Sequence, residues 1–144
     1  MNHSLKIAGI SIITSTAEAF NQNTIGQLWG EFAKQPIKEK LKSVISDNIF
    51  AVYSEYENKH HGKYRTTIGF AVDPASNIPA EFSTVIIPAG KYKTFEPKSS
   101  APNDIITIWS EIWDMDSVKL PRNYVADFEE YAADGQVKIH IGII

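Results

Sequence analysis

The feature that most constrains the fold of this chain is a repeated eight-residue pattern. Residues 25–32 read IGQLWGEF and residues 105–112 read IITIWSEI, so both follow Ile-x-x-(Leu/Ile)-Trp-x-Glu-(Phe/Ile). The apolar residues recur at helical spacing in each segment, which predicts a helix with one apolar stripe. Each segment is followed by two apolar runs joined by a short polar turn, in residues 49–72 and 124–144, which predicts a β-hairpin. The chain is therefore predicted to contain a duplicated module.

The repeat predicts an α+β fold made of two β-α-β-β halves. A strand is expected before each helix, in residues 5–13 and 91–97. A further strand in residues 82–88 is expected to pair with the second of these through the Ala89-Gly90 turn. Residues 36–47 are expected to contain a short extra helix. We expect one domain over residues 1–144, with pseudo-repeats at about 1–75 and 80–144. The two halves should form one antiparallel-rich sheet with two main helices packed on it, so that Trp29 and Trp109 become equivalent.

The charge and composition of the chain exclude several classes of protein. The formal net charge of −3 and the pI of about 5.8 argue against a nucleic-acid-binding surface, which is normally basic. No segment approaches the ~18 apolar residues of a membrane span. The absence of cysteine excludes disulfides, thiol nucleophiles and thiolate metal sites. These features predict a cytoplasmic domain that does not associate with membranes.

The histidines give no indication of a metal or cofactor site. His60 and His61 are adjacent in an expected hairpin turn, where two neighbouring histidines rarely reach one metal, and nothing nearby completes a ligand set. His140 alternates with isoleucines in the last strand, which predicts a solvent-facing or hydrogen-bonded side chain. The chain also lacks a glycine-rich phosphate loop, HExxH and GxSxG. We therefore expect neither a metal nor a cofactor.

The strand expected before the last turn contains three carboxylates, in the stretch Asp127-Phe128-Glu129-Glu130-Tyr131. Such positions usually hold Val, Ile or Thr. Side chains alternate along a strand, so Asp127, Glu129 and Tyr131 share one face while Phe128 and Glu130 share the other. Two interpretations follow: the charges protect a solvated sheet edge from further pairing, or one acid is buried for a function.

Alignment of the two copies favours a functional role for one of these acids. The alignment pairs Tyr53 with Phe128 and Ser54 with Glu129, so one half has a carboxylate where the other has a small hydroxyl group. A duplicated module creates a cleft on its pseudo-twofold axis, and clefts of this kind often hold ligands. This asymmetry makes Glu129 a candidate functional acid, while the residue pattern alone leaves the sheet-edge interpretation equally open.

Aromatic residues are the second indication of function. The three Trp, six Tyr and seven Phe are concentrated in the expected helices and strands. Core packing is the simpler interpretation of Trp29 and Trp109, whereas Trp113 is placed to close a pocket wall. Aromatic faces attract cations by ~0.5–2 kcal/mol per good contact. A desolvated carboxylate adds an ion pair, but only when a cationic partner arrives. Together these residue types predict a receptor for an apolar, positively charged molecule.

Several stretches carry a resemblance that extends from end to end. They are the helix IGQLW, the strand IFAVYSEY, the segments GKYRTTIGF and VIIPAGKYKTF, the helix IWSEIW and the terminal pair DFEEY and VKIHIGI. In these the chain resembles the GyrI-like, or multidrug effector-binding, family. It is similar to the ligand domains of AraC-type and MerR-type transcription factors and to stand-alone members encoded on integron gene cassettes. The resemblance implies the same duplicated β-α-β-β fold.

The resemblance also implies site residues. The Glu of the family's Phe-Glu-x-Tyr motif is the central pocket carboxylate, and here that position is Glu129, with Tyr131 two residues on. With this resemblance we predict that Glu129 is the buried functional acid and that Glu130 faces solvent. Family pockets are lined by Trp and Tyr from helices and strands. The matching positions are Trp29, Tyr53, Tyr56, Tyr92, Trp109 and Trp113.

The expected function is binding of a lipophilic cationic small molecule. Two alternatives stay open at this point. One is a protein–protein modulator, such as a gyrase inhibitor, which requires a protein partner. The other is a hydrolase of strained electrophilic small molecules that uses the pocket Glu, although we expect binding rather than turnover. The expected domain takes up all 144 residues and leaves no helix-turn-helix module, so direct nucleic-acid binding is not expected.

Overall fold

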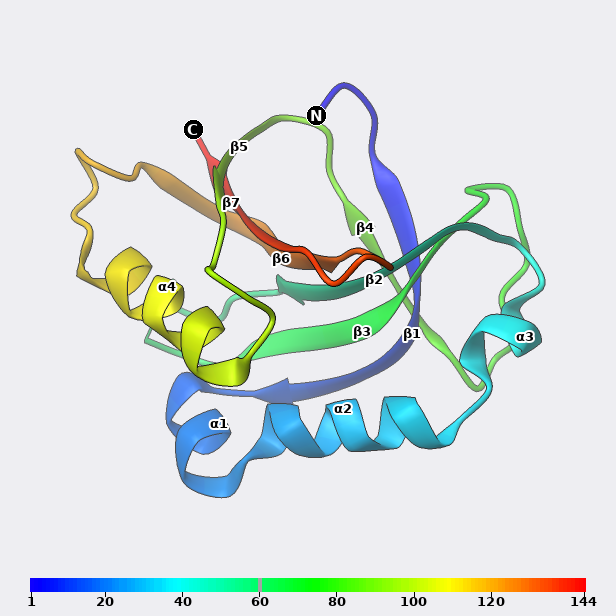
Figure 1. Ribbon diagram of the computed structural model, residues 1–144. Coiled ribbons are helices and arrows are strands. Elements are labelled where there is room, and N and C mark those ends of the chain that lie inside the picture. The colour runs from blue at the N-terminus through cyan, green and yellow to red at the C-terminus, as the bar shows by residue number, and fades with distance from the viewer. Residues whose placement is uncertain (60) are drawn as a thin grey trace.

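A computed structural model describes residues 1–59 and 61–144 and contains a seven-stranded sheet with helices on it (Figure 1). The strands are β1 (Leu5–Thr14), β2 (Val44–Ser54), β3 (Tyr64–Val72), β4 (Ser83–Ile87), β5 (Lys91–Phe95), β6 (Arg122–Tyr131) and β7 (Val137–Ile143). The helices are α1 (Thr16–Gln22), α2 (Thr24–Lys34), α3 (Ile37–Leu41) and α4 (Pro102–Asp114). None of the helices in this described part of the chain is long and apolar enough to span a membrane.

The order of the strands confirms the α+β fold and its duplication. The sheet runs β4-β1-β3-β2-β6-β7-β5, and every pair is antiparallel. Without β4, the order is β1-β3-β2 followed by β6-β7-β5. Equivalent strands of the two halves therefore lie at equal distances from the centre, where β2 pairs with β6. The repeated helices are α2 and α4, which carry Trp29 and Trp109.

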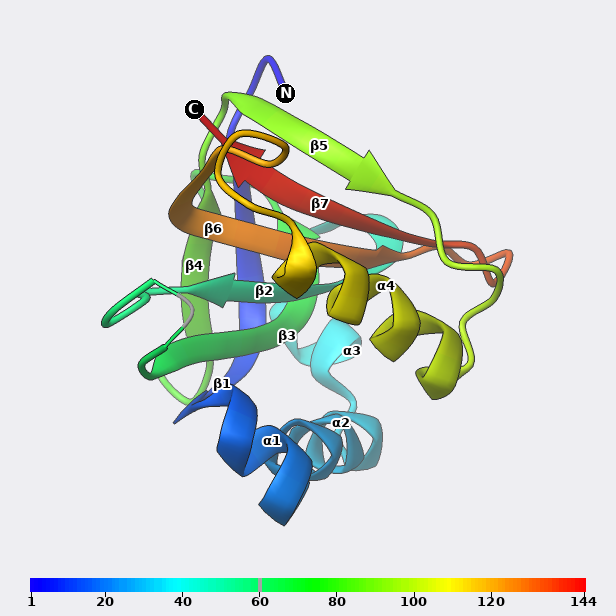
Figure 2. The same ribbon diagram turned by 90° about the vertical axis from the view of Figure 1, so that its left-hand side faces the viewer.

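Both repeated helices lie on the same face of the sheet (Figures 1 and 2). From α2, Leu28 and Phe32 pack on a buried cluster that includes Ala51 of β2. From α4, Trp109 and Ile112 pack on a second cluster that includes Tyr53. Ala51 and Tyr53 are two residues apart on one strand, so the two helices cover neighbouring halves of a single face.

The opposite face of the sheet is buried because the sheet curves until its two edge strands approach each other on that side. Ile87 of β4, Phe128 of β6 and Tyr92 of β5 belong to or pack against one cluster, although β4 and β5 are the two edge strands. The Tyr92 ring meets Phe128 edge-on with centroids 5.5 Å apart. The chain terminus helps to close this curl, since Met1 and Gly90 exchange two backbone hydrogen bonds.

The expected pairing of residues 82–88 with 91–97 is wrong. β4 pairs with β1, where Leu5 lies opposite Ile87, whereas β5 pairs with β7 at the other edge. The Pro88-Ala89-Gly90 segment is therefore a connection between two sheet edges and not a hairpin turn. The physical reason is that β3 pairs with only one edge of β1, so the other edge is free to pair with β4. In a two-stranded hairpin with β5, the apolar residues of β4 would stay exposed.

One short helix near the start of the chain departs from the sequence expectation. The seven-residue helix α1 was not expected, although its sequence Ser15-Thr16-Ala17-Glu18 has the spacing of a capping box. Ser15 caps it by accepting a hydrogen bond from the Glu18 backbone N–H at 3.2 Å. The short helix expected in residues 36–47 is α3.

The close approach of β1 to β3 generates a prediction about stability. Gly69 lies opposite Gly9, and a Cβ on Gly69 would be 2.1 Å from the backbone oxygen of Ala8. We expect Gly69→Ala to lower the free energy of unfolding by roughly 2–4 kcal/mol, because two paired backbones have to separate. Gly30 is the control, since it lies on the exposed side of α2 with nothing near its added Cβ. Gly30→Ala should raise stability by about 0.5–1 kcal/mol in the same urea titration. Equal effects of the two changes would contradict this account of the β1–β3 contact.

Candidate ligand-binding cavity

A cavity of about 710 Å³ lies between the helices and the centre of the sheet. Its walls come from α1, α2 and α4, its floor comes from β2, β3 and β6, and its volume suits a drug-sized molecule. The residues that line it are Thr16, Ala19, Phe20, Asn23, Ile25, Gly26, Trp29, Ile49, Tyr53, Tyr56, Tyr64, Ser100, Pro102, Ile105, Ile106, Trp109, Trp113, Arg122, Glu129 and Tyr131.

The carboxylate of Glu129 is the central polar group of this cavity. Glu129 is only 3% exposed and accepts three hydrogen bonds from aromatic residues. Tyr53 Oη donates to Oε2 at 3.1 Å, Trp109 Nε1 donates to Oε2 at 2.7 Å, and Tyr131 Oη donates to Oε1 at 2.5 Å. No Lys, Arg or His of the described residues forms an ion pair with it. The charge of this carboxylate is thus solvated by hydrogen bonds but not neutralised.

The surroundings of Glu129 change its proton affinity. Burial raises the pKa of the Glu129 carboxyl above its ordinary value, and the hydrogen bonds from Tyr131, Trp109 and Tyr53 offset part of that increase. Burial, together with the adjacent Glu129 charge, also raises the pKa of the hydroxyl groups of Tyr53 and Tyr131. These hydroxyls therefore stay protonated and act as donors to the carboxylate.

A second carboxylate, Asp127, is buried two residues earlier but has a cationic partner. Asp127 is fully buried, and Arg122 Nη2 donates to its Oδ2 at 2.6 Å. The Tyr56 hydroxyl donates to the same oxygen at 2.5 Å, and the Gly142 backbone N–H donates to Oδ1 at 2.9 Å. The ion pair neutralises Asp127, so Glu129 remains the uncompensated charge of the described cavity.

The aromatic walls are organised around the same carboxylate. Tyr53 and Trp109 meet edge-on with ring centroids 5.4 Å apart, and Trp29 and Tyr131 meet in the same way at 5.0 Å. Trp113 continues the wall from Trp109, at 6.1 Å between centroids. Because the N–H and O–H groups point at Glu129, the rings surround the negative charge with apolar and quadrupolar surface.

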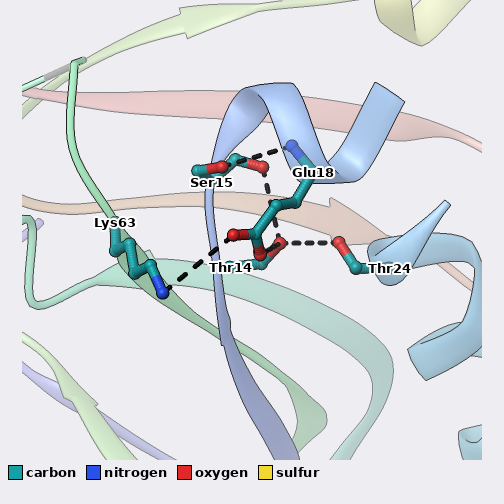
Figure 3. Close-up of polar contacts among 5 residues, drawn as sticks. All are labelled: Thr14, Ser15, Glu18, Thr24 and Lys63. Atoms are coloured by element: carbon teal, nitrogen blue, oxygen red, sulfur yellow. Dashed lines mark hydrogen bonds and ion pairs between the residues drawn. The ribbon is translucent and has the colours of Figure 1, made fainter. Parts of the chain in front are cut away.

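Helix α1 forms the outer wall and is attached by polar contacts at its start (Figure 3). The buried Thr14 hydroxyl lies 2.6 Å from the hydroxyl of Thr24, at the first residue of α2, and donates to Glu18 at 3.4 Å. Glu18 also forms an ion pair with Lys63 at 4.0 Å. These contacts hold α1 so that Phe20, which is 55% exposed, reaches Trp113 of α4 at 5.9 Å between ring centroids.

The structure brings seven of the eight expected site residues to the cavity. Tyr92 is the exception: it packs against Phe128 on the opposite face of the sheet, and its hydroxyl donates to the Pro88 carbonyl at 2.6 Å. The family resemblance was the reason to include it, since family pockets are lined by Trp and Tyr, but the face that a residue occupies depends on strand register, which residue type does not determine. The seven residues at the cavity are Trp29, Tyr53, Tyr56, Trp109, Trp113, Glu129 and Tyr131.

The pairing of β2 with β6 shows that the sequence alignment of the two copies is shifted by an odd number of residues in these strands. The alignment therefore matched residues that lie on opposite faces of the sheet. Ala51 lies directly opposite Glu129, so Tyr53 shares the cavity face, whereas Ser54 lies opposite Ala126 on the other face. Ser54 is therefore not the structural counterpart of Glu129. The argument that a small hydroxyl group replaces the carboxylate in the first half was wrong, although both halves do contribute to the site.

Glu130 lies on the other face of β6, as the alternation of side chains predicted. It is partly exposed and does not line the cavity. His140 lies 3.2 Å from one carboxylate oxygen and the Asn48 amide donates to the other at 2.8 Å. These contacts lower the pKa of the Glu130 carboxyl, with the His140 contact as the main cause. His140 is thus hydrogen-bonded and stacks on Phe128, in line with the simple interpretation of that residue.

Sequence reasoning missed several cavity residues, including Phe20, Tyr64 and Arg122. The capping-box spacing could have revealed the helix that carries Phe20. No local signal marks Arg122, because a register shift in β6 brings it beside Asp127. No group of three or more potential metal ligands occurs among residues 1–59 and 61–144. The expectation about the His60-His61 pair concerns His60, which lies outside the described residues.

Comparison with known proteins identifies relatives over nearly the whole chain. Residues 3–143 match the model of the Cass2 family, described as integron-associated effector binding protein. YobU of Bacillus subtilis (strain 168), named as a candidate transcriptional regulator, is 30% identical over 147 residues, which cover 96% of this chain and 91% of YobU.

Solved structures share the fold. The integron cassette protein VCH_CASS2 of Vibrio cholerae has a TM-score of 0.78 at 25% identity, and the match covers 100% of this chain and 92% of that one. The structure of SAV2435 bound to tetraphenylphosphonium has a TM-score of 0.77 at 17% identity, with 99% and 90% covered. The family match and these coverages together establish that this chain belongs to the Cass2 family of integron-associated effector binding proteins.

Proposed function

We propose that this effector-binding protein takes up a lipophilic organic monocation, with Glu129 as its counter-ion and the aromatic walls as its cage. The observation that carries the proposal is the buried carboxylate that has three aromatic hydrogen-bond donors and no cationic partner among the described residues. An ionised carboxylate is costly to bury without a partner. A bound cation removes this cost and gains cation–π contacts with the surrounding rings.

The charge balance of the cavity supports a cation over an anion. Arg122 also lines the cavity, but its charge is balanced by Asp127. The net charge that a ligand meets is therefore that of Glu129, which repels anions and gives neutral molecules no ion pair. SAV2435, which shares the fold, was solved with tetraphenylphosphonium, an aromatic monocation of this kind. The protein-modulator and hydrolase alternatives stay predictions, since no contact in the cavity favours them.

Charge selectivity tests the proposal with two probes of nearly the same shape. Tetraphenylphosphonium and tetraphenylborate differ mainly in the sign of their charge, so ring stacking alone would treat them alike. We expect the cation to bind and the anion to bind far more weakly in a titration followed by tryptophan fluorescence, because Trp109 and Trp113 lie in the cavity wall. Glu129→Gln should lower the cation affinity about 10- to 100-fold by removing a charge-assisted contact.

Glu130→Gln is the matched control for this titration. Glu130 is on the same strand but on the opposite face, so its loss of charge should leave the affinity within about twofold. Equal binding of the phosphonium and the borate, or an undiminished affinity in Glu129→Gln, would contradict the cation proposal.

The same substitution should act on stability with the opposite sign. Glu129→Gln keeps the shape, its amide oxygen can accept from Tyr53 and Trp109, and its amide nitrogen can donate to the Tyr131 hydroxyl. Because it removes a buried unpaired charge, we expect the ligand-free variant to be as stable as wild type or more stable by about 1 kcal/mol at neutral pH. The folded-state pKa of Glu129 is raised, so this difference is complete above that pKa and vanishes below the unfolded value of about 4.3. Melting curves of wild type and variant at neutral pH and below a pH of about 4.3 check this difference. A variant that is strongly destabilised at neutral pH would show that the carboxylate stabilises the fold.

Cation affinity should also depend on pH. Burial raises the pKa of the Glu129 carboxyl, so lowering the pH through that pKa protonates the carboxyl and removes the counter-ion. Tetraphenylphosphonium has a permanent charge, so only the protein titrates. We expect its affinity to fall as the pH decreases from about 8 to about 4.5, while the weak binding of Glu129→Gln stays constant. A pH dependence that persists in Glu129→Gln would assign the effect to another group.

A further inference from the structure

The end of the cavity next to Asp127 contains a guanidinium group whose hydrogen-bonding capacity is only partly used. The Arg122 side chain is 8% exposed and lines the cavity. Its Nη2 donates to Asp127, but its Nε is buried and has no hydrogen-bond partner among the described residues. A guanidinium has five N–H donors, and a buried donor without an acceptor is unfavourable. Because the Arg122 side chain lines the cavity, a ligand acceptor that reaches those N–H groups which Asp127 leaves unused and which face the cavity would improve the hydrogen bonding of this guanidinium.

The local backbone is shaped to bring Arg122 to this position. The β6–β7 register shifts between Arg122 and Asp127, and Tyr124 between them has a φ of 55°, in the left-handed region. A non-glycine residue in this conformation carries strain, which is common near functional sites. The Tyr124 ring lies over the guanidinium, with 4.4 Å from its centroid to Cζ. The shift and the ring hold the guanidinium against the cavity, where a regular strand would not place it.

The distance between the two charged ends of the cavity sets the size of a ligand that reaches both. Asp127 and Glu129 are two residues apart on one face of β6, so their side chains leave the strand roughly 7 Å from each other. Because Arg122 is hydrogen-bonded to Asp127, its guanidinium lies on the order of 7 to 10 Å from the Glu129 carboxylate. One substituted aromatic ring spans a distance of this order.

We propose that Arg122 forms a second polar subsite, which makes the preferred ligand an aromatic cation with an uncharged hydrogen-bond acceptor about one ring away from its positive centre. The inference rests on the proposed function, since Glu129 holds the cationic end. The acceptor is uncharged, such as a ketone or amide carbonyl, because Asp127 already balances Arg122. A ligand carboxylate would meet the negative charges of Asp127 and Glu129.

Two triphenylphosphonium probes test this subsite. One carries a fourth aryl group with a para-acetyl substituent, and the other carries the isosteric para-isopropyl substituent, which has no acceptor. We expect wild type to bind the acetyl probe about 10-fold more tightly by isothermal titration calorimetry, which corresponds to one added hydrogen bond to a charged donor. Glu129→Gln should weaken both probes and keep the ratio between them.

Two variants remove the subsite while preserving the charge balance or the ion pair. Arg122→Met combined with Asp127→Asn removes both charges together, so no buried ion is left unpaired. Arg122→Lys keeps an ion pair with Asp127 but loses the planar fork of donors. Both should reduce the ratio of the two affinities from about 10 toward about 1, and thermal melts identify any variant that fails to fold. The matched control is Arg65→Met with Glu55→Gln, an ion pair outside the cavity, which should keep the wild-type ratio.

The outcomes separate this inference from the proposed function. Tight binding of both probes by wild type with equal affinities would overturn the subsite and leave the cation site standing. A ratio that survives in both Arg122 variants would assign the acceptor to another donor and would also overturn it. If neither probe binds, the cation proposal fails and the subsite falls with it.

Discussion

The hydrogen bonding of Glu129 is the interaction on which the cavity depends. One carboxylate accepts from Tyr53 of β2, Trp109 of α4 and Tyr131 of β6, so it connects the centre of the sheet to the helix that covers it. Each donor is an aromatic side chain whose polar atom points inward and whose ring becomes cavity wall. The hydrogen bonds to this carboxylate therefore fix the positions of the three rings around it. If its three donors turned away, the walls would lose their common point of attachment and the carboxylate would lose its solvation.

Much of this arrangement follows from sequence periodicity. Helical spacing located α2 and α4, and turn residues located the hairpins β2–β3 and β6–β7, because these signals act within a few residues. Alternation along β6 separated Glu129 from Glu130, which the structure places on opposite faces. The repeat then predicted that two copies of one module share a single antiparallel-rich sheet, as the strand order confirms. Local patterns and internal symmetry were sufficient for the two main helices and the hairpins, whereas the choice of Glu129 as the central acid rested on the family resemblance.

What the sequence did not reveal depends on distant pairing. β4 does not pair with β5, which follows it in the chain. It pairs instead with the free edge of β1, about 80 residues away in the sequence, so the turn after β4 does not determine its partner. The same kind of information places Tyr92 on the far face and makes Ser54 a poor counterpart of Glu129, because an odd shift in register exchanges the two faces. The position of Arg122 at the cavity was not predicted for a related reason, because it depends on the register shift in β6. Errors of this type concern the partner of a strand or the face of a residue, and they leave the location of the strand in the sequence correct.

The two buried acids of β6 differ in whether the protein itself provides a cationic partner, and the proposed ligand selectivity depends on this difference. Asp127 and Glu129 are neighbours on one face, and both are removed from water. If both had protein cations, the cavity would be neutral and would favour neutral molecules. If neither had one, the two unpaired charges would oppose folding at a cost that marginal stability does not tolerate. Arg122 neutralises one acid and the aromatic hydroxyl and indole groups only solvate the other. The remaining single charge accepts three hydrogen bonds and has no cationic partner among the described residues. Under the proposed function a bound cation supplies that partner, and the charge selectivity of the cavity then follows from which of its two acids has a partner within the protein.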